Sequence, residues 1–482
     1  MKSILSKLCK TGYIYLFISS IIAAVVCFLN LGTKSFWVDE VHSINLASNL
    51  SFMFSTAWHE TPNMLFYYFL LHFWLKLGNS EFVVRSFSAI FAVLTIIPMY
   101  LLGKKLFNHK VGLIAALLLS VNGFFVEYAQ EVRSYSLLIF LIVISTYFLV
   151  SLEKKFNKKN YVLYVLITAL AIYTQFFAIF FVLSQAVYVL IRNRGEILNK
   201  KFLLQFLSVG FLTLPLLFFP SFSHQGNLGW VGPVSLADGI DLFIQLSGGF
   251  YTGLFSLLFI FISIYFLQKK KLKFGNEFTL TLILLCLPII LTFFISIYIK
   301  PIYVQRYLII CLPFFILLIS YFLSFLYSKR VYFLIIFIFL ILSFLNIHQV
   351  YYGFSFAKED WRDATSYVLS NYEPHDTVLF YAYFVRGPFE YYKNNSSEKN
   401  KVVSMPELSM AYYSSGGGTV LPEPNLKLID KLNSRIWLVL SHESGVDLRD
   451  RQRTEILNKI LSEYQLVRTV EYKGISVLLF KR

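Results

Sequence analysis

The sequence predicts a polytopic all-α membrane domain followed by a small α/β domain. Of the 482 residues, 57% are hydrophobic and only 15% are charged. Apolar runs of about 20 residues, the length that crosses a hydrocarbon core as a helix, recur as far as residue 348. This composition excludes a soluble multidomain protein and a disordered chain.

About eleven membrane helices are expected from hydropathy along residues 1–348. The spans are predicted at 11–31, 84–106, 111–126, 134–152, 159–174, 176–193, 201–221, 242–267, 277–299, 306–327 and 330–348. The first outer loop, about 32–83, has room for interfacial helices. We expect one at 64–77, because His72 and Lys76 interrupt this short apolar stretch.

The formal net charge of +16 sits in the short loops between the predicted spans. With the N-terminus inside, the inner segments hold 20 Lys and Arg against 3 acids, whereas the outer loops hold 6 cations and 8 acids. This asymmetry follows the positive-inside rule of an integral plasma (inner) membrane protein, with its long loops outside. The positive charge is thus explained by topology, and nucleic acid is excluded as a partner.

The composition changes after the last predicted span, where residues 349–482 are expected to form an extracytoplasmic domain. From Tyr351 to Arg482 there are 17 Lys and Arg and 16 Asp and Glu. Short apolar runs at 377–381, 435–440 and 475–480 predict strands, and 360–370 and 450–464 predict helices. Strands and helices in this mixture indicate an α/β fold.

Two adjacent carboxylates, Asp39 and Glu40, follow the first predicted span beside Phe36 and Trp37. Such a position at the water boundary suits a general base, because partial desolvation raises a carboxyl pKa. The alternative is structural: Asp39 could cap a helix that starts near Glu40, since acids favour helix N-termini.

Further along the same loop, His59 and Glu60 are the candidate ligands for a divalent metal cation. Two neighbouring ligands without a third are a weak signal, so a polar turn before a helix is the alternative.

The short outer connection between the third and fourth spans is rich in polar side chains. It contains Gln130, Glu131, Arg133 and Tyr135, flanked on both sides by hydrocarbon. Polar groups at this depth are costly unless they are paired or functional. The connection is therefore either a cluster that positions a substrate or an internal Glu–Arg pair that clamps two helix ends.

Arg306 and Tyr307 open the tenth predicted span on the outer side. An arginine there opposes the positive-inside bias, so it is a candidate ligand for a lipid phosphate. The alternative is that Arg306 snorkels to a lipid headgroup.

Together these residues resemble the GT-C glycosyltransferases, in particular the bacterial branch of family 39. That branch is related to protein O-mannosyltransferases and to the aminoarabinose transferases of lipid A. The resemblance covers most of the membrane part and rests on Asp39-Glu40, the helix start at Pro62, the phrase Tyr128–Tyr135, Arg306-Tyr307-Leu308 and the tail phrase Lys358–Arg362.

The resemblance implies an inverting transfer of a sugar from a polyprenyl-phosphate donor to an acceptor hydroxyl or phosphate on the outer face of the membrane. Asp39 would then be the catalytic base, and Glu40 would orient Asp39 or the acceptor. Arg133 and Arg306 would neutralise the leaving phosphate. Gln130, Glu131, Tyr135 and Tyr307 would hold the donor or its pocket.

The resemblance implies a lipid, a glycan or a protein as acceptor. Relatives often carry His-Pro-Pro or Lys-Pro-Pro where this chain has Thr61-Pro62-Asn63. This departure removes one expected metal or phosphate contact. Two other functions stay open, a flippase or other transporter of lipid-linked oligosaccharides and a polysaccharide ligase. A transporter predicts polar residues near the bilayer midplane, whereas here they gather at the outer boundary.

Overall fold

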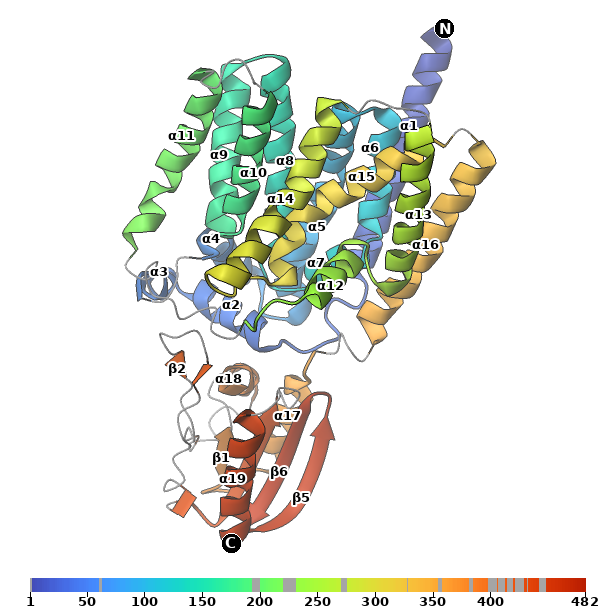
Figure 1. Cartoon of the computed structure of the whole chain (residues 1–482). Coiled ribbons are helices and arrows are strands. Elements are labelled where there is room, and N and C mark those ends of the chain that lie inside the picture. The colour runs from blue at the N-terminus through green and yellow to red at the C-terminus, as the bar shows by residue number, and fades with distance from the viewer. Residues whose placement is uncertain are drawn as a thin grey trace.

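The protein is a helical bundle with a small sheet beyond one of its ends (Figure 1). The structure, a computed structural model, describes residues 2–59, 63–192, 200–219, 231–269, 275–326, 328–353, 358–380, 385–397, 405, 412–413, 419–420, 429–430, 432–441 and 448–482. The bundle helices are α1 (Lys2–Phe28), α5 (Glu81–Leu106), α6 (His109–Ser120), α7 (Gly123–Ala129), α8 (Tyr135–Lys154), α9 (Lys158–Thr174), α10 (Ala178–Arg192), α11 (Lys200–Thr213), α12 (Leu236–Leu246), α13 (Phe250–Lys269), α14 (Asn276–Tyr298), α15 (Leu312–Ser324) and α16 (Lys329–Tyr352).

Every predicted membrane span falls on one of these helices, on a bent pair of them, or on η5 (Gln305–Cys311) with α15, which confirms the all-α membrane fold. Five described helices are individually long and apolar enough to cross a bilayer, and two bent pairs bring the number to seven. Shorter apolar helices cover the spans predicted at 11–31, 176–193 and 201–221, and α9 covers 159–174. The span predicted at 306–327 begins with a 3-10 segment, η5 (Gln305–Cys311), that leads into α15.

The two bends have identifiable causes in the sequence. The pair α6 and α7 bends by 58°, where Asn122 caps α7 by accepting a hydrogen bond from Phe125 N at 3.0 Å. The pair α12 and α13 bends by 94° at Gly248 and Gly249, whose φ angles are +96° and +134°. A Cβ on Gly249 would lie 2.5 Å from Asn346, so the close approach and the backbone angle both require glycine there.

The first outer loop folds into three short helices at the end of the bundle nearer the sheet (Figure 1). They are α2 (Val38–Ser48), α3 (Leu50–His59) and α4 (Leu65–Trp74), and a 3-10 turn, η1 (Leu75–Leu77), follows α4. The helix predicted at 64–77 is thus confirmed as α4 with η1. Because α2 contacts α3, α4 and η1, it is held in place at the end of the bundle nearer the sheet.

The residues after α16 form a four-stranded sheet with helices. Its strands are β1 (Thr377–Phe380), β4 (Arg435–Ser441), β5 (Gln465–Tyr472) and β6 (Ile475–Lys481), in the order β1-β4-β6-β5. The pair β1 and β4 is parallel and the other pairs are antiparallel. The remaining elements are α17 (Trp361–Asn371), α18 (Arg386–Asn394), α19 (Leu448–Glu463) and the strand pair β2 (Tyr412–Tyr413) with β3 (Thr419–Val420).

The three predicted strands and two predicted helices of this part are confirmed as β1, β4, β6, α17 and α19. Strand β5 was not predicted, because most of its side chains are exposed and it lacks an apolar run. The core residues form two clusters, one among the bundle helices and one from Trp361 onward. The domain boundary at 348/349 stays a prediction.

Candidate functional site

The first turn of α2 carries both candidate carboxylates. Trp37 is extended, with φ −102° and ψ 175°, and the helix begins at Val38. The predicted alternative, in which Asp39 caps a helix that starts near Glu40, therefore differs from the structure. The contact typical of a capped N-terminus comes instead from Glu40, whose Oε2 accepts a hydrogen bond from Trp37 N at 3.4 Å.

Asp39 faces two guanidinium groups that come from distant parts of the chain. Its Oδ2 lies 3.6 Å from Arg306 Nη1 and 3.9 Å from Arg133 Nη2. The Asp39 side chain is 29% exposed, so water reaches it. Both distances exceed the roughly 2.7–2.9 Å of a charge-assisted hydrogen bond. The two arginines are thus near enough to compensate the charge of Asp39, and neither is locked to it.

Arg133 lies between α7 and α8, almost completely buried. Burial by itself would lower the pKa of its guanidinium, but Asp39 and the neighbouring tyrosines outweigh this effect and raise the pKa above its ordinary value. Arg133 Nη1 donates to Ser43 Oγ at 3.4 Å, while Nε has no hydrogen-bond partner among the described residues. A buried cation with a spare donor is a suitable ligand for an anion. The clamp predicted as an alternative, an internal pair of Glu131 with Arg133, is not the arrangement seen here.

Aromatic side chains line the same place. The guanidinium of Arg306 lies 5.7 Å from the Tyr307 ring centroid, and the Tyr307 ring lies 4.9 Å from that of Phe177. The ring of Tyr135 lies 4.6 Å from that of Tyr128. The buried Tyr135 hydroxyl has no hydrogen-bond partner within the described part of the chain, which leaves it available to a polar ligand.

Glu40 points into the protein and is completely buried. Its carboxylate accepts hydrogen bonds from Arg85 Nε at 2.8 Å, Arg85 Nη2 at 2.7 Å and Val132 N at 3.1 Å, and Lys358 Nζ lies 3.3 Å away. Burial would raise the pKa of Glu40, but the charges of Arg85 and Lys358 outweigh it and lower the pKa to about 2. Glu40 is therefore an anion at neutral pH, held in a closed cluster.

Arg85 and Lys358 are the two charged partners of Glu40 that the sequence analysis did not select. Arg85 also donates to the carbonyls of Leu31, Lys34 and Ser35 at 3.1, 2.7 and 2.9 Å, so it fixes the segment that leads into α2. Arg85 could have been selected from the sequence, because it is a cation at the predicted outer boundary of the membrane, as Arg306 is. No local pattern marks Lys358 as a partner of the first loop.

Gln130 and Glu131 contact groups other than the Asp39 carboxylate. The amide nitrogen of Gln130 donates to the carbonyls of Leu29, Cys27 and Val26 at 2.8, 3.2 and 3.3 Å, so it caps the end of α1. A carboxylate oxygen of Glu131 lies 3.6 Å from Lys358 Nζ, and burial raises the pKa of Glu131 above its ordinary value. These two residues link the end of α1 and Lys358 to the chain between α7 and α8, behind the first turn of α2.

The two candidate metal ligands are adjacent near the middle of the first loop's sequence. His59 is the exposed last residue of α3, and Glu60 lies outside the described residues. Within the described ranges no group of three or more His, Cys, Asp or Glu side chains could hold a metal ion. Two guanidiniums face Asp39, so positive charge already compensates its carboxylate. The pairing of His59 with Glu60 stays a prediction.

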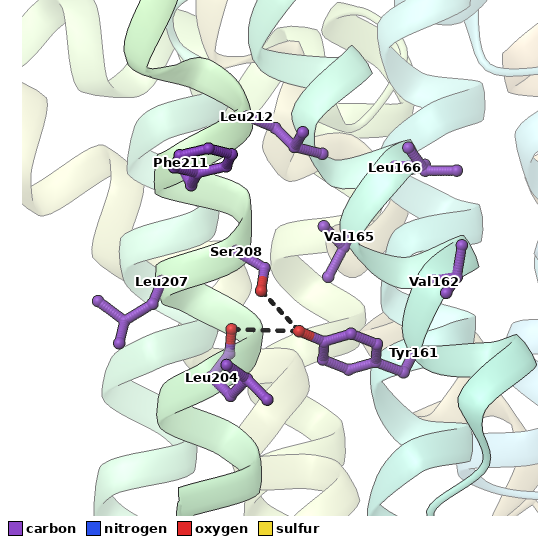
Figure 2. Close-up of a pocket in the computed structure, with 9 residues that line it drawn as sticks. All are labelled: Tyr161, Val162, Val165, Leu166, Leu204, Leu207, Ser208, Phe211 and Leu212. Atoms are coloured by element: carbon purple, nitrogen blue, oxygen red, sulfur yellow. Dashed lines mark hydrogen bonds between the residues drawn. The ribbon is translucent and has the colours of Figure 1, made fainter.

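A separate hollow of about 570 Å³ lies between α9 and α11 (Figure 2). Its polar groups pair with one another, because the Tyr161 hydroxyl lies 2.6 Å from Ser208 Oγ. The other lining residues are apolar: Val162, Val165, Leu166, Leu204, Leu207, Phe211 and Leu212. None of the candidate site residues lines this hollow.

Comparisons with known proteins agree with the predicted GT-C fold. Residues 60–221 match the family described as dolichyl-phosphate-mannose-protein mannosyltransferase. No curated protein sequence matches the chain significantly. Among solved structures, ArnT from Cupriavidus metallidurans in the apo state is similar over 98% of both chains, with 14% identity and a TM-score of 0.67.

Two further solved structures are similar and have lipid phosphates bound. ArnT from Cupriavidus metallidurans bound to undecaprenyl phosphate matches over 97% of this chain and 98% of that one, with 13% identity and a TM-score of 0.62. The archaeal oligosaccharyltransferase AglB from Archaeoglobus fulgidus, in complex with an inhibitory peptide and a dolichol-phosphate, matches over 82% of this chain and 64% of that one, with 14% identity and a TM-score of 0.51. At these identities the likeness establishes the fold.

Proposed function

The chain is an integral membrane protein with the GT-C fold, and from this premise we propose that it is an inverting glycosyltransferase. It would move a sugar from a polyprenyl-phosphate donor to an acceptor on the outer face of the membrane. The observation that carries the proposal is that the Asp39 carboxylate meets the guanidiniums of Arg133 and Arg306. The reaction needs one group that accepts a proton and cations that bind a phosphate.

In the proposed step an acceptor hydroxyl attacks the anomeric carbon from the side opposite the phosphate. The new glycosidic bond forms as the bond between the anomeric carbon and the phosphate oxygen breaks, which inverts the configuration. Asp39 accepts the proton of the hydroxyl, and the electron pair of the broken bond leaves with polyprenyl phosphate. Arg133 and Arg306 stabilise the negative charge that develops on this leaving group.

The other residues of the cluster have supporting roles in this proposal. The unpartnered hydroxyl of Tyr135 is available to a sugar or phosphate oxygen, and Tyr307 packs beside Arg306 and forms an aromatic wall. Glu40 holds the first turn of α2 through Arg85. Gln130 and Glu131 support the wall behind it.

The outward orientation of the site is also part of the proposal. It is supported by the basic C-terminal ends of three bundle helices, where Lys105, Lys154 and Arg192 lie in the last turns of α5, α8 and α10. These cations belong on the cytoplasmic side by the positive-inside rule. Asp39, Arg133 and Arg306 lie at the other ends of these helices, and so face the exterior or periplasm.

A divalent cation is left out of the proposed step, because two guanidiniums already face Asp39. Turnover in EDTA is expected to equal turnover without it. If EDTA abolished turnover and added Mg²⁺ or Mn²⁺ restored it, His59 and Glu60 would return as candidate ligands.

The proposal is tested by a transfer assay in nanodiscs, with polyprenyl-phosphate sugars as donors and membrane lipid extract as acceptor source. Wild type is expected to release polyprenyl phosphate, and Asp39→Asn, which keeps the shape and removes the base, is expected not to. The matched control is Asp241→Asn, which neutralises an exposed carboxylate on α12. A wild type that releases no polyprenyl phosphate while it moves intact lipid-linked sugar between leaflets would instead be a flippase.

The same assay separates two kinds of acceptor. A phosphate acceptor is already ionised and has no proton for Asp39 to take. Transfer to a hydroxyl acceptor that survives in Asp39→Asn would contradict the role of Asp39 as the base, whereas transfer that survives only to a phosphate acceptor would show that this acceptor needs no base.

A further inference from the structure

The chain that follows the last membrane helix returns to the candidate site. Lys358 Nζ lies 3.3 Å from a carboxylate oxygen of Glu40 and 3.6 Å from one of Glu131, and it donates to the carbonyl of Gln130 at 3.3 Å. The Lys358 side chain is only 14% exposed. A largely shielded lysine from the C-terminal part therefore lies directly behind the turn that carries Asp39.

The backbone on the C-terminal side of Lys358 is fastened to the first loop and to the sheet. Ser35 Oγ donates to the Glu359 carbonyl at 2.5 Å and accepts from Trp361 N at 3.1 Å. The Glu359 carboxylate accepts from Trp361 Nε1 at 2.6 Å and from Ser441 Oγ, on β4, at 2.8 Å. These bonds fix the backbone next to Lys358, and so they fix the position from which its side chain extends to Glu40.

A second set of contacts joins the C-terminal part to the start of α5. Glu81 pairs with Arg362 at 2.9 Å and accepts from the Tyr392 hydroxyl at 2.8 Å. That hydroxyl in turn accepts from Phe36 N at 2.6 Å. The Arg362 side chain is 40% exposed. The ion pair of Arg362 with Glu81 is therefore more accessible to solvent than the contacts of Lys358, and it contributes less to stability.

Lys358 contacts both carboxylates that lie behind the first turn of α2. Glu40 and Glu131 supply two negative charges, and Arg85 and Lys358 supply two positive charges. Removal of one partner from such a buried cluster leaves an uncompensated charge, which is strongly destabilising for the local structure. Since Glu40 directly follows Asp39, any relaxation of the cluster moves the Asp39 carboxylate.

We propose that Lys358 is a positioning residue for the transfer reaction: through Glu40 and Glu131 it holds the first turn of α2, and so holds Asp39 where it faces Arg133 and Arg306. This inference rests on the proposed function, and it gives the C-terminal part a role in catalysis. Lys358 acts through Glu40 and does not touch the reacting atoms. A displacement of about 1 Å at a catalytic group can cost about 100-fold in rate.

The test compares Lys358→Met with Arg362→Met in the full-length protein. Both variants remove a cation from the same interface, but only Lys358 touches Glu40. We expect Lys358→Met to lower kcat by about 10- to 100-fold with the KM for the polyprenyl-phosphate donor within about twofold, because Arg133 and Arg306 are unchanged. Lys358→Arg, which keeps the charge, is expected to restore most of the loss, and Arg362→Met is expected to stay near wild type.

A second readout does not depend on turnover. Hydrogen exchange of the α2 amides is expected to become faster in Lys358→Met than in wild type or Arg362→Met. The inference is overturned if both variants lose kcat equally, if KM rises in place of a fall in kcat, or if α2 exchange is unchanged. A wild type without any turnover, together with faster α2 exchange in Lys358→Met alone, would reject the transferase and leave the positioning contact standing.

Discussion

The two sides of the first turn of α2 differ although they begin from adjacent carboxylates. On one side, Asp39 is partly exposed and lies 3.6 and 3.9 Å from two guanidiniums. On the other, Glu40 is buried and hydrogen bonded to Arg85 at 2.7 and 2.8 Å. Successive side chains on a helix point roughly 100° apart, so one residue faces the mouth of the bundle and the next faces its interior. The Asp39 side therefore has longer ion-pair distances and more exposure to water, and the Glu40 side has short hydrogen bonds and no exposure to water.

The largest effect is expected on the open side. Asp39→Asn should lower kcat by about 10² to 10⁴-fold, the contribution of a general base, and leave the unfolding temperature close to that of wild type. Turnover and thermal unfolding in the same nanodiscs measure both quantities. A large drop in unfolding temperature would mean that Asp39 is structural, as Glu40 is, and the contrast would fail.

Glu40→Gln should show the opposite balance. It leaves the Arg85 charge buried without its counter-ion, so the free energy of unfolding should fall by about 3–5 kcal/mol. The measurement is the unfolding midpoint against wild type. The double variant Glu40→Gln with Arg85→Met should be less destabilised than the single variant, because no charge is then stranded. Equal or greater destabilisation would show that the ion pair is not the cause.

Arg306 tests whether the cations beside Asp39 bind the leaving phosphate. Arg306→Gln should lower kcat/KM by about 100-fold, because one of the two cations that would receive the leaving phosphate is lost. Arg306→Lys should recover part of this, since it keeps the charge without the planar fork. The control is Lys76→Gln, an exposed cation of the outer boundary that faces Phe73. Equal losses in both variants would point to a general effect of surface charge.

The smallest expected effect is the loss of stability at low pH that comes from protonation of Glu40. The pKa of Glu40 is lowered from the ordinary 4.5 to about 2, so the unfolded state binds the proton more readily. The stabilisation is present above pH 4.5 and is lost as the pH falls toward 2. We expect a loss of about 1 kcal/mol by pH 4 and about 2 kcal/mol by pH 3 relative to pH 6. Glu40→Gln should lack this part of the acid response, and an unchanged response would contradict the assignment.

The sequence predicted the membrane fold well because hydropathy is local information. Asp39, Arg133 and Arg306 stand out in the sequence because charged groups beside hydrocarbon need a partner or a function. The structure brings their side chains together, and their roles in a reaction stay predictions. What the sequence could not predict is which polar residue turns to which side. Gln130 was expected at the donor, yet its amide caps α1, because the chain between α7 and α8 is not helical and its side chains diverge.

Partners far apart along the chain were also beyond local reasoning. Lys358 meets Glu40 only because the chain after α16 returns to the first loop. Strand β5 was missed for a related reason, since an exposed edge strand is defined by its pairing with β6 and has little apolar periodicity of its own.

The return of Lys358 to the first loop also sets an order of assembly. Glu40 and Arg85 belong to the first loop and to α5, so their pair becomes possible early in synthesis. Lys358 comes after α16, the last helix of the bundle, and it meets Glu131 only when the whole bundle has been inserted. The chain therefore completes the support of its candidate catalytic turn as one of the last events of its biogenesis, and a partly inserted protein does not hold the finished site.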